Sequence, residues 1–422
     1  MQARAFVSGL GCAGPHGIGT AAFESGLRHG RTATRTLTLF DATDLPCRVA
    51  AQVPDFDPEA YGARRDRGRV ARVVPLALLA AEEALRSAGF DPATMPPALR
   101  RDLYVVVGSG AGPVEYAERQ YRDFFARGPR AVGPYSVPCA TPGSLASEIS
   151  IRFGLGGMST VVTSGCTSST DALGLALELV RGGRAERVLC GGADACITPA
   201  ILAGYCTLGV VSTAWNEQPE RAARPMSADR DGFVLGEGAW FVVLESAAAL
   251  RRRERAAWAE LAGYGVTCEA YHRVAMREDG VESARAMTLA LADAGVEAAE
   301  VDYVNVHGTG TALNDRVETR AVKHALGVHA ERIPLSATKS LIGHPQGASG
   351  AAGVAATLLG MRGGWVPPTA NLEHADAECD LDYVAASAAR LHRVRVALCN
   401  GLGFGSRNAA LVLRAVDGHD AD

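Results

Sequence analysis

The sequence predicts an α/β protein built from two similar halves, and three observations support this fold class. First, residues 102–110 (Asp-Leu-Tyr-Val-Val-Val-Gly-Ser-Gly) recur in similar form 200 positions later, at residues 302–310 (Asp-Tyr-Val-Asn-Val-His-Gly-Thr-Gly). Second, each copy follows a predicted helix that ends in Ala-Gly. Third, each half continues with a strand–turn–helix unit and closes with a similarly worded strand, at residues 187–192 and 396–401. Two similar sets in the same order indicate an internal duplication, with a site where the halves meet.

Composition narrows the class of protein. The chain has 422 residues, of which 48% are apolar, so it is long enough for a large core and for two or three domains. A net charge of −4 favours neither nucleic acid nor a membrane surface as a partner. No apolar run reaches membrane-spanning length, and the N-terminus lacks the apolar core of a signal peptide. The ten cysteines form no Cys-x-x-Cys pair, which argues against zinc and disulfides and predicts a reducing, cytoplasmic location.

The N-terminal elements follow in order. Residues 5–11 predict a first strand that runs into a glycine-rich turn, and residues 20–30 predict a helix. Residues 31–60, rich in proline and threonine, predict a surface excursion. A long helix is expected over residues 70–88, ended by Gly89. Five arginines gather at its start: Arg64, Arg65, Arg67, Arg69 and Arg72. Such a cluster is often only a solvated face, but it opposes the helix dipole and thereby hints at an anionic partner.

A stretch around Cys166 carries the first chemical signal. Residues 160–163 predict a short buried strand, followed by a Ser-Gly turn, Cys166 and a hydroxyl-rich helix start. A cysteine in such a turn lies near the free N–H groups of the helix, whose dipole favours the thiolate. A buried structural cysteine is the alternative, but packing requires neither the preceding glycine nor the hydroxyl residues. We therefore predict that Cys166 is a nucleophile.

Two histidines in the second half complete the predicted site. His307 follows a buried strand, and His344 lies in a glycine-flanked turn before a helix of small residues. Either histidine alone could be structural, but both share the strand-end setting of Cys166, where ligands gather in α/β sheets. Together they predict a nucleophile with two imidazoles that donate hydrogen bonds to a developing oxyanion. A metal site is the weaker interpretation, because no carboxylate lies at ligand spacing beside either histidine.

These motifs resemble those of the β-ketoacyl-acyl carrier protein synthases, which have the thiolase-like fold. Residues 163–174 look like the nucleophile motif of type II polyketide ketosynthases, and residues 306–319 resemble the first histidine motif. Residues 339–350 resemble the lysine–histidine motif, and residues 403–406 the late glycine loop. The resemblance covers essentially the whole chain. It implies a layered αβαβα core with an N-terminal half at 1–255, a C-terminal half at 256–415 and a tail at 416–422.

The resemblance also implies residue roles. Cys166 would carry the growing acyl chain as a thioester, while His307 and His344 polarise the malonyl carbonyl and stabilise the enolate. The remaining implied roles are a supporting ion pair (Lys339 and Glu318), an oxyanion hole from backbone N–H groups (Cys166 and Phe404), pantetheine binding (Thr309 and Thr311), pocket lining and gating (Phe233 and Phe404), and a small residue that leaves the acyl pocket open (Ala111). No metal or organic cofactor is implied.

The implied partners are an acyl carrier protein and a second ketosynthase-type subunit. We expect Arg65, Arg67 and Arg69 to dock the acidic carrier. The second subunit would be either a copy of this chain or a chain-length factor, and neither nucleic acid nor membrane is expected. The late loop departs from the family pattern at Ser406 and Arg407, where relatives commonly have a second glycine and a smaller residue. Substrate gating is therefore expected to differ, and a polyene-type or other reducing system stays open.

The predicted activity is the decarboxylative Claisen condensation of malonyl-acyl carrier protein with the chain on Cys166, in a type II polyketide system. A fatty-acid elongating synthase is the main alternative, since its chemistry is the same. A non-catalytic chain-length-factor subunit is less favoured, because that class typically lacks the nucleophilic cysteine. The lysine–histidine motif disfavours a thiolase or a coenzyme A-priming synthase.

Overall fold

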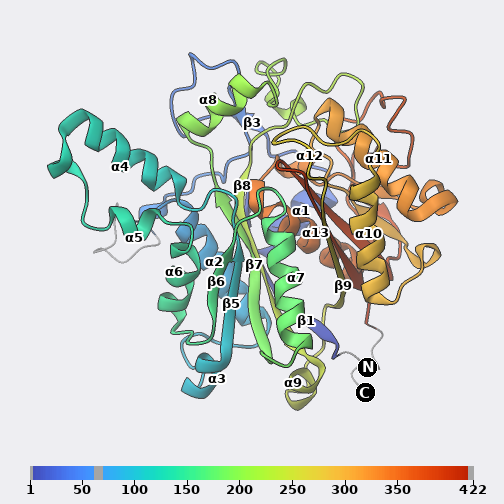
Figure 1. The fold of residues 1–422 in the computed structure, drawn as a ribbon, viewed down its shortest axis with the longest axis horizontal. Coiled ribbons are helices and arrows are strands. Elements are labelled where there is room, and N and C mark those ends of the chain that lie inside the picture. The colour runs from blue at the N-terminus through green and yellow to red at the C-terminus, as the bar shows by residue number, and fades with distance from the viewer. Residues whose placement is uncertain (1–2, 61–69, 417–422) are drawn as a thin grey trace.

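The computed structural model describes residues 3–60 and 70–416, and one continuous sheet runs through the molecule (Figure 1). The predicted carrier-docking residues Arg65, Arg67 and Arg69 lie outside the described residues. The sheet has the strand order β11-β10-β14-β15-β9-β1-β8-β7-β5-β6. Its first half consists of β1 (Ala5–Gly14), β5 (Leu103–Gly108), β6 (Ser159–Val162), β7 (Arg187–Ala195) and β8 (Glu237–Ser246). Its second half consists of β9 (Ala259–Cys268), β10 (Tyr303–Asn305), β11 (Leu335–Ser336), β14 (Val396–Gly403) and β15 (Arg407–Arg414).

The strand order confirms the duplication. Within each half, the strands lie in the order third, second, fourth, fifth and first when numbered along that half. The repeated segments of the sequence are β5 and β10, the second strand of each half. The halves are joined by an antiparallel pairing of their first strands, β1 and β9, over the register pairs from Ala5↔Leu261 to Val7↔Ala259. In this order β6 and β10 lie toward opposite edges of the sheet, one in each half.

Helices form layers on and between the halves. The first half packs against α2 (Val73–Ser87) and α6 (Ser144–Phe153), and the second half against α10 (Val281–Ala294) and α11 (Ala312–Leu326). Figure 1 shows these two pairs on opposite sides of the molecule. Between them, α7 (Ser168–Arg181) and α13 (Ser349–Gly363) touch one another and strands of both halves. Small residues make α13 narrow enough to be buried over most of its length. The predicted layered fold is confirmed.

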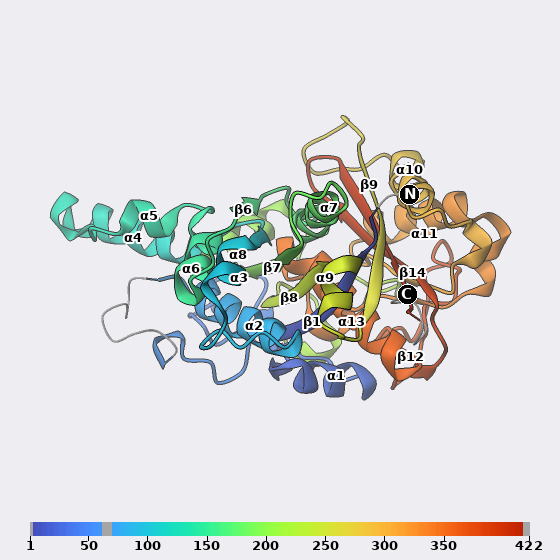
Figure 2. The same ribbon diagram turned by 90° about the horizontal axis from the view of Figure 1, so that it is seen from below.

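Shorter elements decorate this core. They are α1 (Thr20–Arg28), α3 (Pro97–Asp102), α4 (Val114–Arg127), α5 (Ser136–Ala140), α8 (Pro199–Leu208), α9 (Ala247–Arg252), α12 (Lys339–Ile342), β2 (Gly17–Ile18), β3 (Arg35–Thr36), β4 (Val49–Ala50), β12 (Trp365–Val366) and β13 (Arg390–Leu391). Helices α4 and α5 form an arm that projects from the body, as Figures 1 and 2 show. None of the helices in the described ranges has both the length and the apolar character to cross a membrane.

The prediction of a surface excursion at 31–60 was wrong for the middle of that segment. Its strands β3 and β4 pair with each other. Cys47, Val49 and Ala50 are fully buried, where they share a small core with Phe233 and Leu235. The proline and threonine content of this segment therefore gave a misleading prediction, because its middle packs against Phe233 and Leu235.

Candidate active site

The three predicted reactive residues meet at the junction of the halves. Cys166 lies in the turn between β6 and α7, His307 follows β10, and His344 precedes α13. The Cys166 sulfur and a ring nitrogen of each histidine all lie within 4.8 Å of one another. The two imidazole rings are 5.3 Å apart between centroids and nearly perpendicular, at 87°. All three side chains are buried, so the structure brings together residues that the sequence separates by up to 178 positions.

Hydroxyl groups fix the turn that carries Cys166. Gly165 has a φ of 70°, a conformation that glycine adopts without strain. The Ser168 hydroxyl accepts the Ser164 N–H at 2.9 Å and donates to the Gly165 carbonyl at 2.6 Å. Asp171 then accepts a hydrogen bond from the Thr167 hydroxyl at 2.8 Å and another from Ser164. The hydroxyl-rich start of α7 therefore serves to hold the nucleophile turn in one geometry.

The thiol itself is neutral at rest. Burial raises the pKa of Cys166 to about 11, although the Lys339 charge and the backbone N–H groups of Phe404 and Cys166 act in the opposite direction. The expectation that the helix dipole favours a thiolate is therefore outweighed by the loss of solvent. The two N–H groups that lower the pKa of Cys166, those of Cys166 and Phe404, are the two predicted to form the oxyanion hole.

Hydrogen bonds assign the same tautomer to both histidines. The Lys339 ammonium lies 3.3 Å from Nδ1 of His307, and an ammonium can only donate, so this nitrogen is an acceptor. The backbone N–H of Gln346 donates to Nδ1 of His344 at 3.1 Å, which makes that nitrogen an acceptor too. The proton of each neutral ring is consequently on Nε2. Burial and the Lys339 charge hold both histidine pKa values well below the usual range, so each ring is a neutral single donor.

Lys339 and Glu318 support His307 from its backbone. Lys339 donates to the His307 carbonyl at 2.6 Å, while Glu318 accepts the N–H groups of His307 at 2.7 Å and Gly308 at 2.8 Å. Within the described ranges, the two side chains contact His307 and its neighbours rather than each other, so the predicted ion pair is not a direct contact. The Glu318 charge still raises the pKa of Lys339, but burial dominates and lowers it to about 8.

A hollow of about 380 Å³ opens in front of these groups. Its walls include Cys166, His307, His344, Thr309, Thr311, Phe233, Phe404, Leu208, His272, Met276, Leu313 and Gln346. The hydroxyls of Thr309 and Thr311 are 3.0 Å apart, and the Phe233 ring stands edge-on to His344 at 5.2 Å. The two threonines and two phenylalanines predicted from the resemblance therefore line the pocket.

Ala111 departs from its predicted place. It does not line the hollow, and its backbone N–H donates to the buried Asp194 at 3.1 Å. Asp194 also accepts the N–H groups of Gly110 and Gly347, each at 2.7 Å. This carboxylate ties the loop after β5, which includes Ala111, to the turn that carries His344.

Two polar residues of the site were missed by sequence reasoning. The Gln346 side-chain oxygen lies 3.8 Å from the Cys166 sulfur and accepts the Tyr205 hydroxyl at 3.0 Å. Gln346 stands two residues after His344, and that proximity was the available signal. Tyr205 is on α8, and nothing in its local sequence indicated that it contacts Gln346.

The donor set of Cys166, His307 and His344 could in principle hold a soft cation. The adjacent Lys339 ammonium opposes this, because it would repel a divalent ion beside His307. The geometry thus favours hydrogen-bond donation over metal binding.

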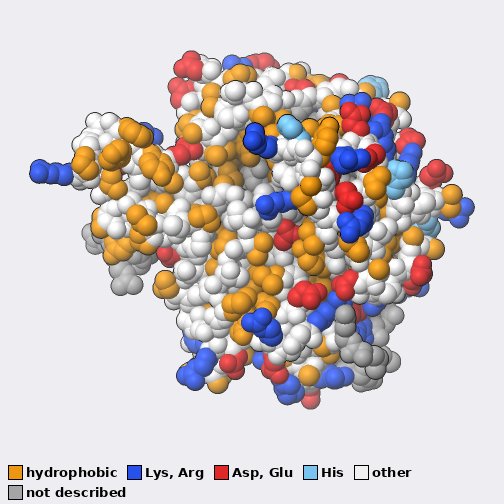
Figure 3. All heavy atoms as spheres, viewed as in Figure 1, with side chains coloured by type: hydrophobic (Ala, Val, Ile, Leu, Met, Phe, Trp, Pro, Cys, Tyr) orange, Lys and Arg blue, Asp and Glu red, His pale blue; other side chains and the backbone are white. Residues whose placement is uncertain are grey.

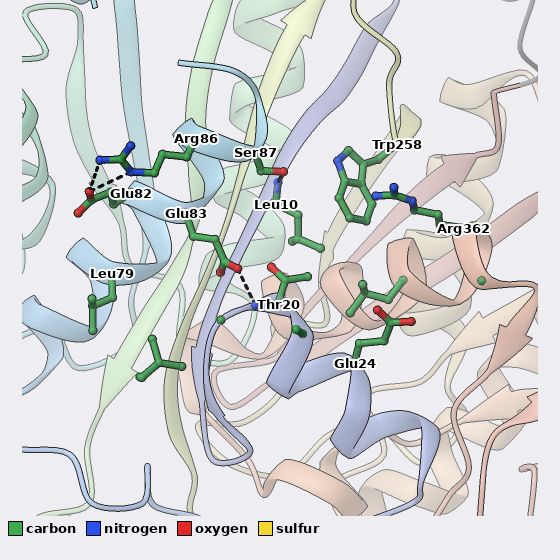
Figure 4. A pocket seen from close by; sticks show the side chains of 15 residues that line it. Leu10, Thr20, Glu24, Leu79, Glu82, Glu83, Arg86, Ser87, Trp258 and Arg362 are labelled. Atoms are coloured by element: carbon green, nitrogen blue, oxygen red, sulfur yellow. Dashed lines mark hydrogen bonds and ion pairs between the residues drawn. The ribbon is translucent and has the colours of Figure 1, made fainter. Parts of the chain in front are cut away.

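A larger, more open hollow of about 980 Å³ lies elsewhere, between α1, α2 and the end of α13 (Figure 4). Its central carboxylate, Glu83, is already bound to the backbone N–H groups of Cys12 at 2.8 Å and Thr20 at 2.7 Å. Arg86 pairs with Glu82 at 3.0 Å. Glu83 thus holds β1, α1 and α2 together, and Arg86 is paired within α2, so the smaller hollow at Cys166 is the candidate active site.

Comparisons with known proteins agree on one family. The family described as "Beta-ketoacyl synthase, N-terminal domain" matches residues 3–249, and "Beta-ketoacyl synthase, C-terminal domain" matches residues 258–373. The chain is 41% identical over 419 residues to the tetracenomycin polyketide synthase ketoacyl synthase alpha subunit of Streptomyces glaucescens, which covers 98% of this chain and 97% of the relative.

Solved structures give the same result. One similar structure is a ketosynthase bound to a hexaketide, in complex with its type II polyketide synthase acyl-carrier protein (TM-score 0.89, 29% identity, 99% of this chain and 100% of that chain). Another is the ishigamide ketosynthase/chain length factor (TM-score 0.91, 32% identity, 99% of this chain and 100% of that chain).

Proposed function

This chain belongs to the β-ketoacyl synthase family, and we propose that it is the condensing subunit of a type II polyketide synthase, with Cys166, His307 and His344 as its catalytic residues. The observation that carries the proposal is the buried triad itself. A thiol and two imidazoles that each present Nε2–H lie within 4.8 Å of one another. This arrangement suits a reaction that needs a covalent acyl carrier and two donors for one developing oxyanion.

Acylation comes first. The Cys166 sulfur attacks the carbonyl carbon of an acyl thioester delivered by the carrier, and the bond from that carbon to the carrier sulfur breaks. The proton of the Cys166 thiol ends on the departing pantetheine thiol. The backbone N–H groups of Cys166 and Phe404, both of which lower the pKa of the thiol, are assigned to stabilise the oxyanion of this step.

Decarboxylation and condensation follow on the acyl-enzyme. The Nε2–H groups of His307 and His344 donate to the thioester carbonyl of malonyl-carrier, and the electron pair left by departing carbon dioxide forms the enolate. The enolate carbon then attacks the Cys166 thioester, the carbon–sulfur bond breaks, and the departing Cys166 thiolate takes up one proton from solvent to restore the thiol. Burial keeps water from the carbanion equivalent, and the Lys339 charge favours the oxyanion through His307.

The substrates arrive on phosphopantetheine, for which Thr309 and Thr311 offer hydroxyls in the pocket wall. The partners are an acyl carrier protein and a second ketosynthase-type subunit, the two kinds of partner in the structurally similar complexes.

The test is intact-protein mass spectrometry after incubation with an acyl carrier protein that bears a short acyl chain. The wild-type protein gains the mass of the acyl group, whereas Cys166→Ala does not. Cys268→Ala is the matched control, since Cys268 is an exposed cysteine that does not line the pocket, and it keeps the mass gain. Acylation that survives Cys166→Ala would overturn the assignment of the nucleophile.

A further inference from the structure

One polar group in the pocket is left without a partner. Gln346 is only 7% exposed, and its amide nitrogen Nε2 is buried with no hydrogen bond among the described residues. The residue lines the hollow in front of Cys166. A buried N–H without an acceptor is costly, so such groups in native sites call for a partner that arrives later.

The other end of the amide is fixed. Its oxygen faces the Cys166 thiol at 3.8 Å and accepts the Tyr205 hydroxyl at 3.0 Å. Burial raises the pKa values of both groups, so each keeps its proton and acts as a donor. The Tyr205 ring is itself held edge-on to Phe233 at 5.2 Å. Two donors on the oxygen leave Nε2 as the free end of the amide.

The backbone prevents Gln346 from turning away. Its φ of 46° is unusual for a residue with a side chain, and two hydrogen bonds hold the turn in that conformation. The Gln346 N–H donates to His344, and the next N–H, of Gly347, donates to Asp194 at 2.7 Å. A strained, doubly anchored turn thus places a free amide donor beside the nucleophile.

We propose that the Gln346 amide N–H donates a hydrogen bond to an oxygen of the acyl chain on Cys166, and so selects 3-oxoacyl chains over saturated ones. This inference rests on the proposed function, because the chain must first be attached to Cys166. In the proposed mechanism the thioester oxygen is bound by the N–H groups of Cys166 and Phe404. The next oxygen of an unreduced chain is on the third carbon, close to the sulfur and therefore to Gln346. A methylene at that position would leave the amide unpaired, which is how hydrogen-bonding sites reject reduced analogues.

The experiment compares acylation of Cys166 by acetoacetyl- and butyryl-acyl carrier protein, measured by intact mass over time. Each rate is divided by the rate at which the same thioester reacts with a free thiol, which removes the difference in intrinsic reactivity. For the wild-type protein we expect a corrected preference of about tenfold for acetoacetyl, the size typical of one buried hydrogen bond. A wild-type preference for butyryl would overturn the inference without any variant.

Variants then locate the effect. The double variant Gln346→Leu/Tyr205→Phe removes both polar groups, so neither is left without a hydrogen-bond partner. We expect its corrected preference to fall to about one. Gln346→Leu alone lowers it while leaving the Tyr205 hydroxyl unpaired. Equal slowing of both chains at an unchanged ratio would overturn chain recognition, because the amide would then act on the sulfur. If the wild-type protein is acylated by neither chain, the proposed function fails instead, and the two failures are distinct.

Discussion

At the scale of single residues, one buried cation organises the site. Lys339 donates to Nδ1 and to the carbonyl of His307, so it fixes the ring tautomer and the position of the strand end together. The same charge lowers the pKa values of both histidines. Neutral imidazoles cannot lose their donor proton near neutral pH, but they also carry no charge of their own to stabilise an enolate. Lys339 supplies that positive charge from behind His307, through its hydrogen bond to Nδ1.

This arrangement predicts the pH dependence of malonyl decarboxylation. Lys339 has a pKa of about 8, so it is charged below that pH and loses its charge above it. We expect carbon dioxide release from malonyl-carrier to be level between about pH 6.5 and 7.5 and to fall above about pH 8, because the enolate loses its nearby cation. The histidines contribute no acid limb in this window, since their pKa values lie well below 6.5.

The matched variants are Lys339→Met and Lys323→Met, because Lys323 is a surface lysine paired with Asp380. Lys339→Met should lower the rate by about 10²-fold, the effect of removing an oxyanion-stabilising group, and abolish the alkaline fall. Lys323→Met should keep both the rate and the profile. An alkaline fall that persists in Lys339→Met would show that another group titrates.

Residue types were predictable from the sequence, but their contacts were not. The glycine-flanked strand ends identified Cys166, His307 and His344, because such turns have a recognisable local pattern. The form of the Lys339–Glu318 interaction was not predictable, since it depends on how the His307 backbone passes between them. The place of Gln346 in the site was also not predicted, because an amide side chain gives no chemical signal until its distance from a nucleophile is known.

At the scale of elements, one serine joins two loops at the pocket. The Ser406 hydroxyl accepts the N–H groups of Tyr271 at 3.2 Å and His272 at 3.1 Å, and donates to the His272 carbonyl at 2.9 Å. The serine follows Phe404, which lines the pocket, and His272 and Met276 of the facing loop line it too. The φ of Ser406 is 65°, a left-handed conformation that is strained for a residue with a side chain. Ser406, where the late loop departs from the family pattern, therefore connects this loop to the loop of Tyr271 and His272.

Two substitutions separate the hydroxyl from the strain. Ser406→Ala loses the three hydrogen bonds and keeps the strained φ, and we expect it to lower the free energy of unfolding by about 1–3 kcal/mol. Ser406→Gly loses the same bonds but relieves the strain, so it should be more stable than Ser406→Ala by about 1 kcal/mol. Urea denaturation measures both, and faster amide exchange at Tyr271 and His272 should accompany each. Unchanged exchange in both variants would contradict the coupling of the loops.

At the scale of the whole molecule, the sequence predicted the duplication and missed the arm. Repeated buried strands have a strong local pattern, and their order in the sheet follows from the repeat. The arm of α4 and α5 has no such pattern, because several of its apolar residues face away from the core, although Tyr116 is buried in it. Phe125 is 81% exposed on α4 and Val137 is 72% exposed on α5. Figure 3 shows apolar side chains gathered on this projection.

An exposed apolar projection of this kind is typical of a protein–protein interface, and one structurally similar protein is a ketosynthase/chain length factor. We therefore predict that Phe125→Glu/Val137→Glu abolishes assembly, because two charges would have to be buried in the subunit interface. Sedimentation velocity would show the shift, for the chain alone if it pairs with a copy and for the mixture if it pairs with a chain-length factor. Val328→Glu/Leu391→Glu is the control, since these residues are 77% and 83% exposed away from the arm, and it should assemble like the wild type. Assembly that survives the arm variant would move the interface elsewhere on the molecule.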